Sequence, residues 1–441
     1  MQRLEALLRV PSISAVPEHA PDMAVAAEAV AQEIRRAGGD VEVRATPRHP
    51  LVLGEVPASS GDPGAPRVLI YGHYDVQPPG DADGWTSPPF DPTVRDGYLY
   101  ARGASDDKGN LFMLLAAVQR LAAAGELPVR AGFVVEGEEE SGGTSALEHF
   151  AGDPGPAMAA LIFDSPMVGP RQPAICTGLR GMVFRRLRVR TAATDGHSGL
   201  FGGAAMNAAH VLVRILGAVS PRDGRLPDAL YAGVAPAGAA EVAAWDTLPP
   251  GAEALATGGL RPADAGAAEG FYMRTLASPS LDVHGLFCGE PFAVKTIVPG
   301  EASAMLSLRL APGQDAPALA ATLDGLLRAA APPGAEVTID DLGVASPAAL
   351  HANDPALVAA AAAIERATGW RPVPVRLGGT LPVVAVLAGR GIPTILTGFG
   401  LPDDGIHAPD ERLRVEHLGI GTRAGMEILR SLGDLQAAAS R

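Results

Sequence analysis

The feature that most constrains the fold is an alternation of helical patterns and short apolar runs in the first third of the chain. Residues 23–39 repeat apolar side chains at helical spacing and end at two glycines, and residues 67–72 form a compact apolar run. A helical pattern returns over 110–126, followed by apolar runs over 129–139 and 159–165. This order is typical of α/β domains, so the sequence predicts a doubly wound, mostly parallel sheet.

A different pattern begins near Gly181, where apolar and charged side chains alternate over residues 182–193. Alternation with a period of two is typical of a strand with one solvated face. Residues 301–312 and 335–342 repeat this pattern on either side of a helical stretch at 316–330. The segment therefore predicts a smaller α+β domain of antiparallel strands and helices.

The end of the chain returns to the first pattern, with a helix expected over 355–370 and an apolar strand within 391–400. A chain of 441 residues exceeds what one hydrophobic core usually supports, so two domains are expected. We predict that residues 1–179 and 344–441 form one domain and that residues 180–343 are inserted into it.

Residues 221–290 of this insertion are rich in Pro, Gly and Ala and have weak periodicity. Two interpretations stay open at this point, an elaborated loop-and-helix insertion and partial disorder.

Composition excludes several classes of protein. Acidic residues outnumber basic ones by 49 to 35 and no basic run is present, so a nucleic-acid partner is not expected. Residues 1–14 carry charges that fit neither a secretory signal nor an anchor, and the apolar stretch 381–400 is interrupted by Gly, Arg and Pro, so no membrane span is expected. Cys176 and Cys288 lack paired spacing, which favours a reducing compartment. We expect a cytoplasmic protein.

Polar residues follow the apolar runs at the positions where open α/β sheets gather functional groups. His73 comes directly after the run at 67–72. Asp75 lies two residues further on, so in an extended segment it projects to the same side, where a carboxylate can orient a metal-bound imidazole. A lone His-x-Asp is ordinarily a turn, and the interpretation depends on further residues of this kind.

Four further sites have the same placement. Asp106 lies in a glycine-rich loop before a helix, three glutamates at 138–140 and Asp164 each follow an apolar run, and His407 lies in a Gly/Pro loop. Helix capping would explain Asp106 alone, and a charged surface loop would explain the glutamates. Taken together, these residues predict a hydrolytic centre with two metal ions, in which Asp106 is the candidate bridge. Of two adjacent glutamates, one would bind metal and the other would accept a proton, but the residues alone do not decide which pair serves.

Five motifs then carry a family resemblance: GHYDVQPPG, GWTSPPFDP, DGYLYARGASDDKGN, EGEEESGG and DDGIHAPDE. In this order they resemble the dizinc peptidases and deacylases, which include carnosinase-like dipeptidases, aminoacylases, acetylornithine deacetylase and succinyl-diaminopimelate desuccinylase. The DDKG and EEESGG forms are most similar to the carnosinase-like branch. The resemblance implies a catalytic domain at 1–179 and 344–441, and a lid and dimerisation domain at 180–343.

The resemblance also implies roles for the metal ligands. His73 and Asp164 would belong to one metal half-site, with Asp106 as the bridge. Glu140 and His407 would hold the other ion. Zinc is the default metal for mixed His and carboxylate ligands, and manganese and cobalt are also compatible with them.

Catalytic residues follow from the same resemblance. Glu139 would be the general base that acts on metal-activated water, with Glu138 an additional carboxylate. Asp75 would support catalysis by orienting His73. His197, in TDGHSGLFGG, resembles a histidine that reaches the active site of a partner subunit and polarises the scissile carbonyl, which implies a homodimer.

Substrate-binding residues are carried over from three motifs. Arg309 resembles the arginine that binds the terminal carboxylate of the substrate. Gly379 and Thr380 would face the substrate from a glycine-rich turn, and Thr296 is a further candidate. We expect hydrolysis of dipeptides or short peptides. The alternatives are an N-acyl amino acid deacylase on the same scaffold and a non-catalytic metal-dependent binding protein.

Overall fold

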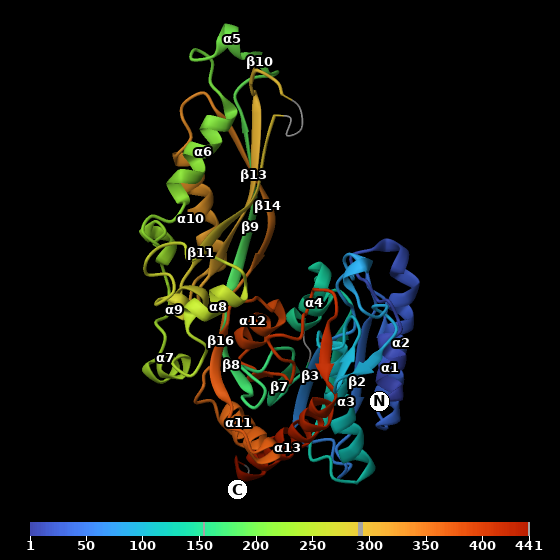
Figure 1. The fold of residues 1–441 in the computed structure, drawn as a ribbon. Helices are drawn as coiled ribbons and strands as arrows, with labels where there is room; N and C mark the ends of the chain where they lie inside the picture. Colours follow the sequence, from blue (N-terminus) through green and yellow to red (C-terminus); the bar gives the residue numbers. More distant parts are fainter. Residues whose placement is uncertain (153–154, 290–293, 440–441) are drawn as a thin grey trace. The chain divides into compact units, whose positions relative to one another are not determined.

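The computed structural model describes residues 1–152, 155–289 and 294–439, and its contacts divide the chain into two compact units (Figure 1). Unit 1 consists of Met1–Thr177, Leu350–Val375 and Val386–Arg441. Unit 2 consists of Gly178–Ala349 and Arg376–Ala385. The chain thus leaves unit 1 for a long central segment, and a second short segment, 376–385, also belongs to unit 2.

Unit 1 is built on a six-stranded sheet with the strand order β1-β2-β6-β3-β7-β17. Its strands are β1 (Asp40–Arg44), β2 (Leu51–Val56), β3 (Arg67–His73), β6 (Arg130–Glu136), β7 (Ala159–Phe163) and β17 (Thr394–Thr397). The four strands β6, β3, β7 and β17 run parallel, whereas β1 and β2 add an antiparallel edge. The parallel strands are nearly continuous apolar runs because both faces of such a sheet are covered.

Helices of unit 1 cover this sheet and one another. They are α1 (Gln2–Leu8), α2 (Ala20–Arg36), α3 (Lys108–Ala123), α4 (Ser145–Ala151), α11 (Pro355–Thr368) and α13 (Val415–Ala439). Helix α3 packs on β3 and β7, α2 packs on β1 and β2, and α13 packs on α3 and α11. Helix α11 begins where Asp354 accepts the N–H of Ala356 and ends at Gly369, whose φ is 74°.

Several short elements complete this description. They are β4 (Thr93–Arg95), β5 (Tyr98–Tyr100), β18 (Arg412–Arg414), β8 (Ala174–Leu179), β15 (Ala348–Ala349), β16 (Val373–Leu377), η1 (Pro17–His19), η2 (Ala82–Gly84), η3 (Glu139–Ser141) and α12 (Pro382–Gly389). Strands β18, β5 and β4 form one three-stranded sheet, and β15, β8 and β16 form another. The sequence patterns did not predict β4, β5, β15 and β18, because two or three residues are too few to show a period.

Unit 2 contains a four-stranded antiparallel sheet with the order β11-β13-β9-β14. Its strands are β9 (Gly181–Arg190), β11 (Ser280–Cys288), β13 (Glu301–Leu310) and β14 (Glu336–Ala345). Along β9, Val183, Leu187 and Val189 are buried, whereas Arg188 and Arg190 are exposed, as the alternation predicts. The buried side packs against α6 (Ala208–Val219) and α10 (Ala316–Ala329) in one apolar core.

The remaining elements of unit 2 settle the part of the insertion that the sequence left open. They are β10 (Gly196–His197), α5 (Ser198–Phe201), η4 (Asp228–Tyr231), α7 (Ala239–Trp245), α8 (Gly251–Thr257), α9 (Phe271–Leu276) and β12 (Ile297–Val298). Residues 221–289 therefore form short helices and the strand β11, which pairs with β13. Residue 290 lies outside the described residues.

The predicted fold class is confirmed, since a mostly parallel α/β sheet and a separate antiparallel α+β unit are both present. Within the described parts of the chain, no helix is long and apolar enough to cross a membrane. The apolar stretch 381–400 forms α12 and β17, as the interruption at Gly389 predicted.

Candidate metal centre and substrate-binding residues

The carboxyl ends of three neighbouring parallel strands bring polar side chains to one edge of the unit 1 sheet. His73 is the last residue of β3, Asp164 directly follows β7, and Glu140 lies in η3 just after β6. Asp106 lies in the loop before α3, and His407 lies in the loop after β17. Strand order and polarity therefore place these five residues at the same edge.

Their potential ligand atoms form two groups that share one carboxylate. His73, Asp106 and Asp164 make the first group, and Asp106, Glu140 and His407 make the second, with the ligand atoms of each group within 4.8 Å of one another. Oδ1 of Asp106 lies 3.2 Å from Nε2 of His73. Oδ2 of Asp106 lies 3.0 Å from Nε2 of His407. The Asp106 carboxylate thus faces both groups, as a bridging ligand would.

Asp75 contacts one residue of each group, His73 and Glu140. Nδ1 of His73 lies 3.3 Å from Oδ1 of Asp75 and 3.1 Å from its carbonyl oxygen. The backbone N–H of Glu140 donates to Oδ2 of the same carboxylate at 3.0 Å. Asp75 therefore holds the His73 ring with Nε2 turned toward Asp106, and it also fixes the backbone at Glu140.

Burial and mutual repulsion raise the pKa values of several carboxyl groups at this edge. Burial, followed by the charge of Asp107, places the pKa of Asp164 well above its usual value. Burial also raises the pKa of Glu139 to about 7, and the neighbouring charges of Glu140 and Asp106 add to the rise. The edge therefore holds more buried acidic groups than its own cations neutralise.

Unpaired buried oxygens mark places where a cation fits. Among the described residues, neither Oε1 of Glu140 nor Oδ1 of Asp107 has a hydrogen-bond partner, although both atoms are buried. Unpartnered buried carboxylate oxygens are costly unless a positive charge approaches them. Imidazole nitrogens and carboxylate oxygens are also the donors that zinc, manganese and cobalt accept. The site therefore fits divalent metal ions, which the two groups that share Asp106 would hold.

The structure gives Glu138 and Glu139 different surroundings. Oε1 of Glu138 accepts the N–H of His49 at 3.1 Å and the hydroxyls of Thr46 and Ser145 at 3.0 and 2.8 Å. Burial alone would raise the pKa of Glu138, but these hydrogen bonds lower it. No described residue forms a hydrogen bond with the Glu139 carboxylate. Glu138 thus holds the segments that carry Thr46, His49 and Ser145, whereas the Glu139 carboxylate is free to accept a proton.

A residue that sequence reasoning missed, Glu411, shapes the loop that carries Asp106. Oε2 of Glu411 accepts from Nη1 of Arg102 at 2.8 Å and from the N–H of Gly103 at 2.9 Å. Its Oε1 accepts the N–H groups of Ser105 and Asp106 at 2.9 and 3.1 Å. The signal was present in DDGIHAPDE, where Glu411 lies close to His407, but its partners lie about 300 positions earlier.

A second unforeseen residue, Asp410, gives the motif GWTSPPFDP a physical role. Its carboxylate accepts the N–H and hydroxyl of Thr86 at 2.9 and 2.6 Å and pairs with Arg95 at 3.1 Å. Asp410 and His407 both have left-handed backbone conformations, with φ of 58° and 60°. Such conformations are uncommon outside glycine and persist only where neighbours impose them. The Thr86 loop therefore supports the loop that presents His407.

Three of the predicted substrate-binding residues lie together in unit 2. Nη1 of Arg309, near the end of β13, donates to Oγ1 of Thr380 at 3.1 Å. The Thr380 hydroxyl in turn donates to the carbonyl oxygen of Arg180 at 2.7 Å. Gly379 precedes Thr380 in the same turn and is exposed. Arg309 and this turn form one polar group.

His197 and Thr296 form a separate group within unit 2. His197 pairs with Ile297 in the two-stranded sheet of β10 and β12, and Ser198 donates its N–H to the carbonyl oxygen of Thr296 at 3.0 Å. Both His197 and Thr296 are exposed. Nδ1 of His197 accepts the N–H of Gly199 at 3.1 Å, which leaves Nε2 as the nitrogen available to a ligand.

Comparison with known proteins assigns the chain to a family. The model for peptidase family M20/M25/M40 matches residues 69–431, which include every predicted metal ligand. The chain belongs to this family. The resemblance predicted from the five motifs is therefore confirmed, and with it the enzyme class of a metallopeptidase.

Relatives in the M20 family extend over nearly the whole chain. A cysteinylglycine-S-conjugate dipeptidase of Corynebacterium striatum is 32% identical over 95% of this chain and 93% of its own length. The structure is similar to an M20 family metallo-carboxypeptidase, Sso-CP2, from Sulfolobus solfataricus, with 25% identity, a TM-score of 0.85 and coverage of 98% and 99%. It is also similar to human carnosine dipeptidase 1, with 26% identity, a TM-score of 0.78 and coverage of 98% and 95%.

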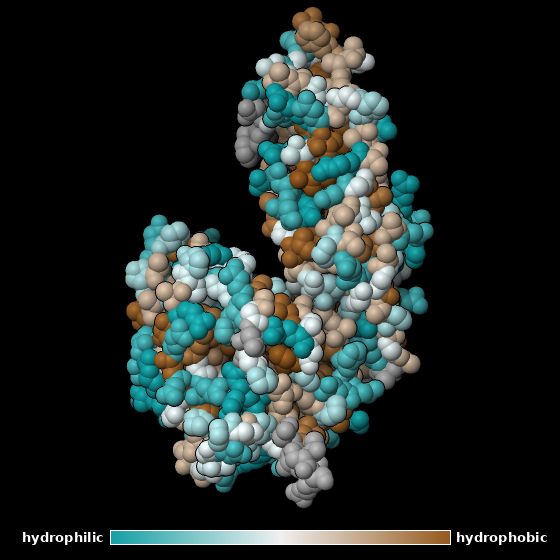
Figure 2. Space-filling view, turned by 180° about the vertical axis from the view of Figure 1, so that it is seen from behind, coloured by the Kyte–Doolittle hydropathy of each residue, from teal (hydrophilic) through white to brown (hydrophobic). Residues whose placement is uncertain are grey.

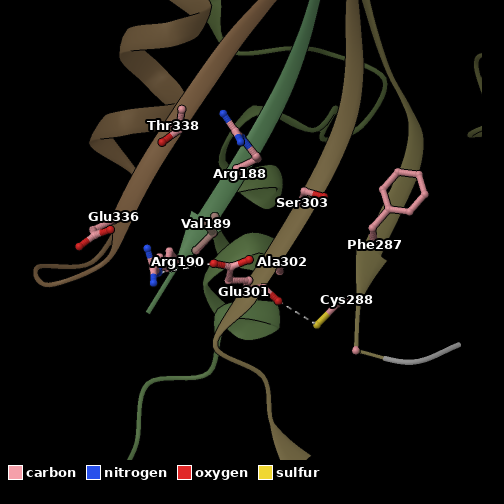
Figure 3. A pocket seen from close by; sticks show the side chains of 11 residues that line it. Arg188, Val189, Arg190, Phe287, Cys288, Glu301, Ala302, Ser303, Glu336 and Thr338 are labelled. Atoms are coloured by element: carbon pink, nitrogen blue, oxygen red, sulfur yellow. Dashed lines mark hydrogen bonds and ion pairs between the residues drawn. The ribbon is translucent and has the colours of Figure 1, made fainter. Parts of the chain in front are cut away.

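The open face of the unit 2 sheet carries a hollow. Strands β9, β11, β13 and β14 line it, with a volume of about 470 Å³ (Figure 3). Arg190 pairs there with Glu301 at 3.5 Å, and the Cys288 thiol faces the Glu301 carbonyl. None of its lining residues is a predicted metal ligand or substrate-binding residue.

Proposed function

We propose that this M20 peptidase hydrolyses the amide bond of dipeptides or short peptides at a centre of two divalent metal ions. The observation that carries the proposal is the position of Asp106, whose two oxygens face His73 and His407 separately. Asp164 would complete the first half-site and Glu140 the second.

When bound, the metal ions would supply positive charge that polarises the amide carbonyl and makes a water molecule more acidic. Glu139 would accept the proton from that water as it attacks the carbonyl carbon. The same carboxyl group would then donate the proton to the leaving nitrogen as the C–N bond breaks. Its pKa near 7 suits a group that takes and returns a proton near neutrality. Asp75 would keep His73 oriented throughout.

We propose zinc as the metal at both positions, because two histidines and three carboxylates are donors that zinc favours. Manganese or cobalt would use the same donors. Metal analysis of the purified protein, combined with reconstitution of the metal-free form by each ion, would distinguish them.

Arg309, Gly379 and Thr380 would bind the part of the substrate that follows the scissile bond. A guanidinium presents paired N–H donors that match a carboxylate, so Arg309 would bind a free terminal carboxylate. The names of the similar proteins, a dipeptidase of C. striatum and human carnosine dipeptidase 1, support dipeptides over N-acyl amino acids. A terminal carboxylate is also consistent with the carboxypeptidase named among the similar structures.

We further propose a homodimer in which His197 acts on the partner's substrate. His197 lies beside Thr296, close to the beginning of β13, whereas Arg309 lies near the end of the same strand. Arg309 lies eight positions after Glu301 along β13, which corresponds to about 27 Å at 3.4 Å per residue. An extended dipeptide spans only about 7 Å. One copy of unit 2 therefore cannot offer both groups to one dipeptide, but two copies can.

Exposed apolar side chains near His197 support this dimer. Leu200 and Phe201 in α5 are 76% and 52% exposed. Figure 2 shows hydrophobic residues at the end of unit 2 that carries α5. Large side chains of this kind favour contact with another protein surface.

The cytoplasmic location stays a prediction from the sequence.

The test of the proposed function is a panel of dipeptides and N-acyl amino acids, incubated with metal-loaded protein while released amines are measured. Release from dipeptides is the expected result. Release from N-acyl amino acids alone would replace the proposal with a deacylase. Metal binding without release from any compound would favour a binding protein.

A further inference from the structure

Arg180, between β8 and β9, joins segments of unit 2 that are far apart in the sequence. Its side chain is buried, and its Nε donates to the carbonyl oxygen of Gly378 at 3.2 Å. Its Nη1 donates to Oγ of Ser280 at 3.1 Å and faces the carbonyl oxygens of Arg274 and Ser278 at 3.4 Å. One guanidinium thus holds the end of α9, the beginning of β11 and the turn before α12.

The same residue is connected to Arg309 through Thr380. The Arg180 side chain contacts the turn at Gly378, and the Arg180 carbonyl accepts the Thr380 hydroxyl. Because Oγ1 of Thr380 also accepts from Nη1 of Arg309, the position of the turn determines where that guanidinium is held. Arg180 therefore forms hydrogen bonds with both ends of the Gly378–Thr380 turn, and Thr380 of this turn contacts Arg309.

The charge of Arg180 needs an explanation, since its acceptors are all neutral. Within the described residues, no carboxylate forms a hydrogen bond or ion pair with Arg180 or Arg309. Burial and the nearby charge of Arg309 lower the pKa of Arg180 to about 10, against the weaker opposing effect of Asp282. Two neighbouring cations that pair directly with no carboxylate are costly for folding alone, although the charge of Asp282 nearby offsets part of this cost. An anion that enters the site would relieve this cost, and the carboxylate of a substrate is such an anion.

We propose that Arg180 is a positioning residue that fixes the Gly378–Thr380 turn and, through Thr380, sets Arg309 for recognition of a free substrate carboxylate. The inference rests on the proposed function, because it assumes that Arg309 binds that carboxylate. Arg180 would not touch the substrate, and yet it would control the preference for substrates with a free carboxyl end.

The test compares a dipeptide with its C-terminal amide in the wild-type enzyme and in R180Q. The loss of one oriented charge contact should raise KM for the free acid about 10- to 100-fold and leave kcat within about twofold. KM for the amide should stay nearly unchanged, so the preference for the free acid disappears. R185Q is the matched control, because Arg185 is a buried arginine of the adjoining strand β9 that pairs with Asp324 and Asp341. It should lower stability and keep the preference.

Two further variants separate positioning from other roles. R180K keeps the positive charge but lacks the planar fork, so it should also lose most of the preference. R180Q combined with T380V should be no worse than the more affected single variant, because both changes act on one connection. A full preference in folded R180Q or R180K, or additive losses in the double variant, would overturn the inference. Absence of dipeptide hydrolysis by the wild-type enzyme would instead refute the proposed function.

Discussion

Replacing Glu411 by glutamine would remove the charge that holds the Asp106 loop. The carboxylate accepts three backbone N–H groups, from Gly103, Ser105 and Asp106, and pairs with the buried Arg102. A glutamine offers one acceptor oxygen, and its amide nitrogen cannot accept from an N–H group. At least part of this set is therefore lost, and Arg102 stays buried without a counter-charge.

The size of the effect follows from the burial of both partners, which are 0% and 1% exposed. Removing one member of a buried ion pair costs about 3–5 kcal/mol. For a domain of this size each kcal/mol corresponds to about 2–4 °C, so the melting temperature should fall by about 6–20 °C. Because Glu411 also orients the backbone at Asp106, metal affinity should fall about 10- to 100-fold.

The assay is thermal unfolding of the metal-free protein, followed by metal titration against a competing chelator. E416Q is the matched control, because Glu416 is 63% exposed and pairs with Arg414 at the surface. That variant should change stability by no more than about 0.5 kcal/mol. If E411Q unfolded at the same temperature as E416Q and bound metal as tightly as the wild type, the role assigned to Glu411 would be wrong.

Three further predictions concern the dimer, the pH dependence of folding and the metal. Mixed dimers of the inactive variants H197A and E139Q should recover about a quarter of wild-type activity, since half of randomly paired dimers are hybrids with one intact site. Zero recovery after subunit exchange would contradict action in trans. Burial raises the pKa of Asp404 to about 6, against the weaker opposing effect of Arg412 and with the help of Asp403. The protonated form contributes stability below about pH 4 that is lost as pH rises through 6. Relative to D404N, the metal-free wild type should therefore lose about 2–3 kcal/mol between pH 4 and 7, and parallel denaturation profiles would refute this. Chelation should lower the unfolding temperature, and metal at 100 times its dissociation constant should restore about 2.7 kcal/mol. An unchanged unfolding temperature would show that these side chains bind no ion.

The grouping of the candidate metal ligands at one edge was predictable because their positions depend on local patterns. His73 and Asp164 directly follow apolar runs, and parallel strands bring such positions to a common edge. The sequence could not decide between Glu138 and Glu139, since both follow the same strand. The structure separates their surroundings through Thr46, His49 and Ser145, which lie about 90 positions before or a few positions after them.

Residues that support the ligands were not predictable, because their partners are distant in sequence. Arg102 and Glu411 are separated by 309 positions, and Thr86 and Asp410 by 324. No periodicity connects such positions. The strand β11 was missed for another reason, because glycine and a bulge near Val283 interrupt its alternation. Tertiary pairing with β13 forms this strand where local pattern is weak.

The most direct test of the two-metal mechanism compares E139Q with E138Q. Removing the general base should reduce kcat for a dipeptide at least about 100- to 10,000-fold, with two metal ions still bound per chain. E138Q should retain most of kcat and instead lower the unfolding temperature, because Glu138 holds loops through His49 and Ser145. Near-normal turnover by E139Q with full metal content would contradict the central claim that Glu139 transfers the proton.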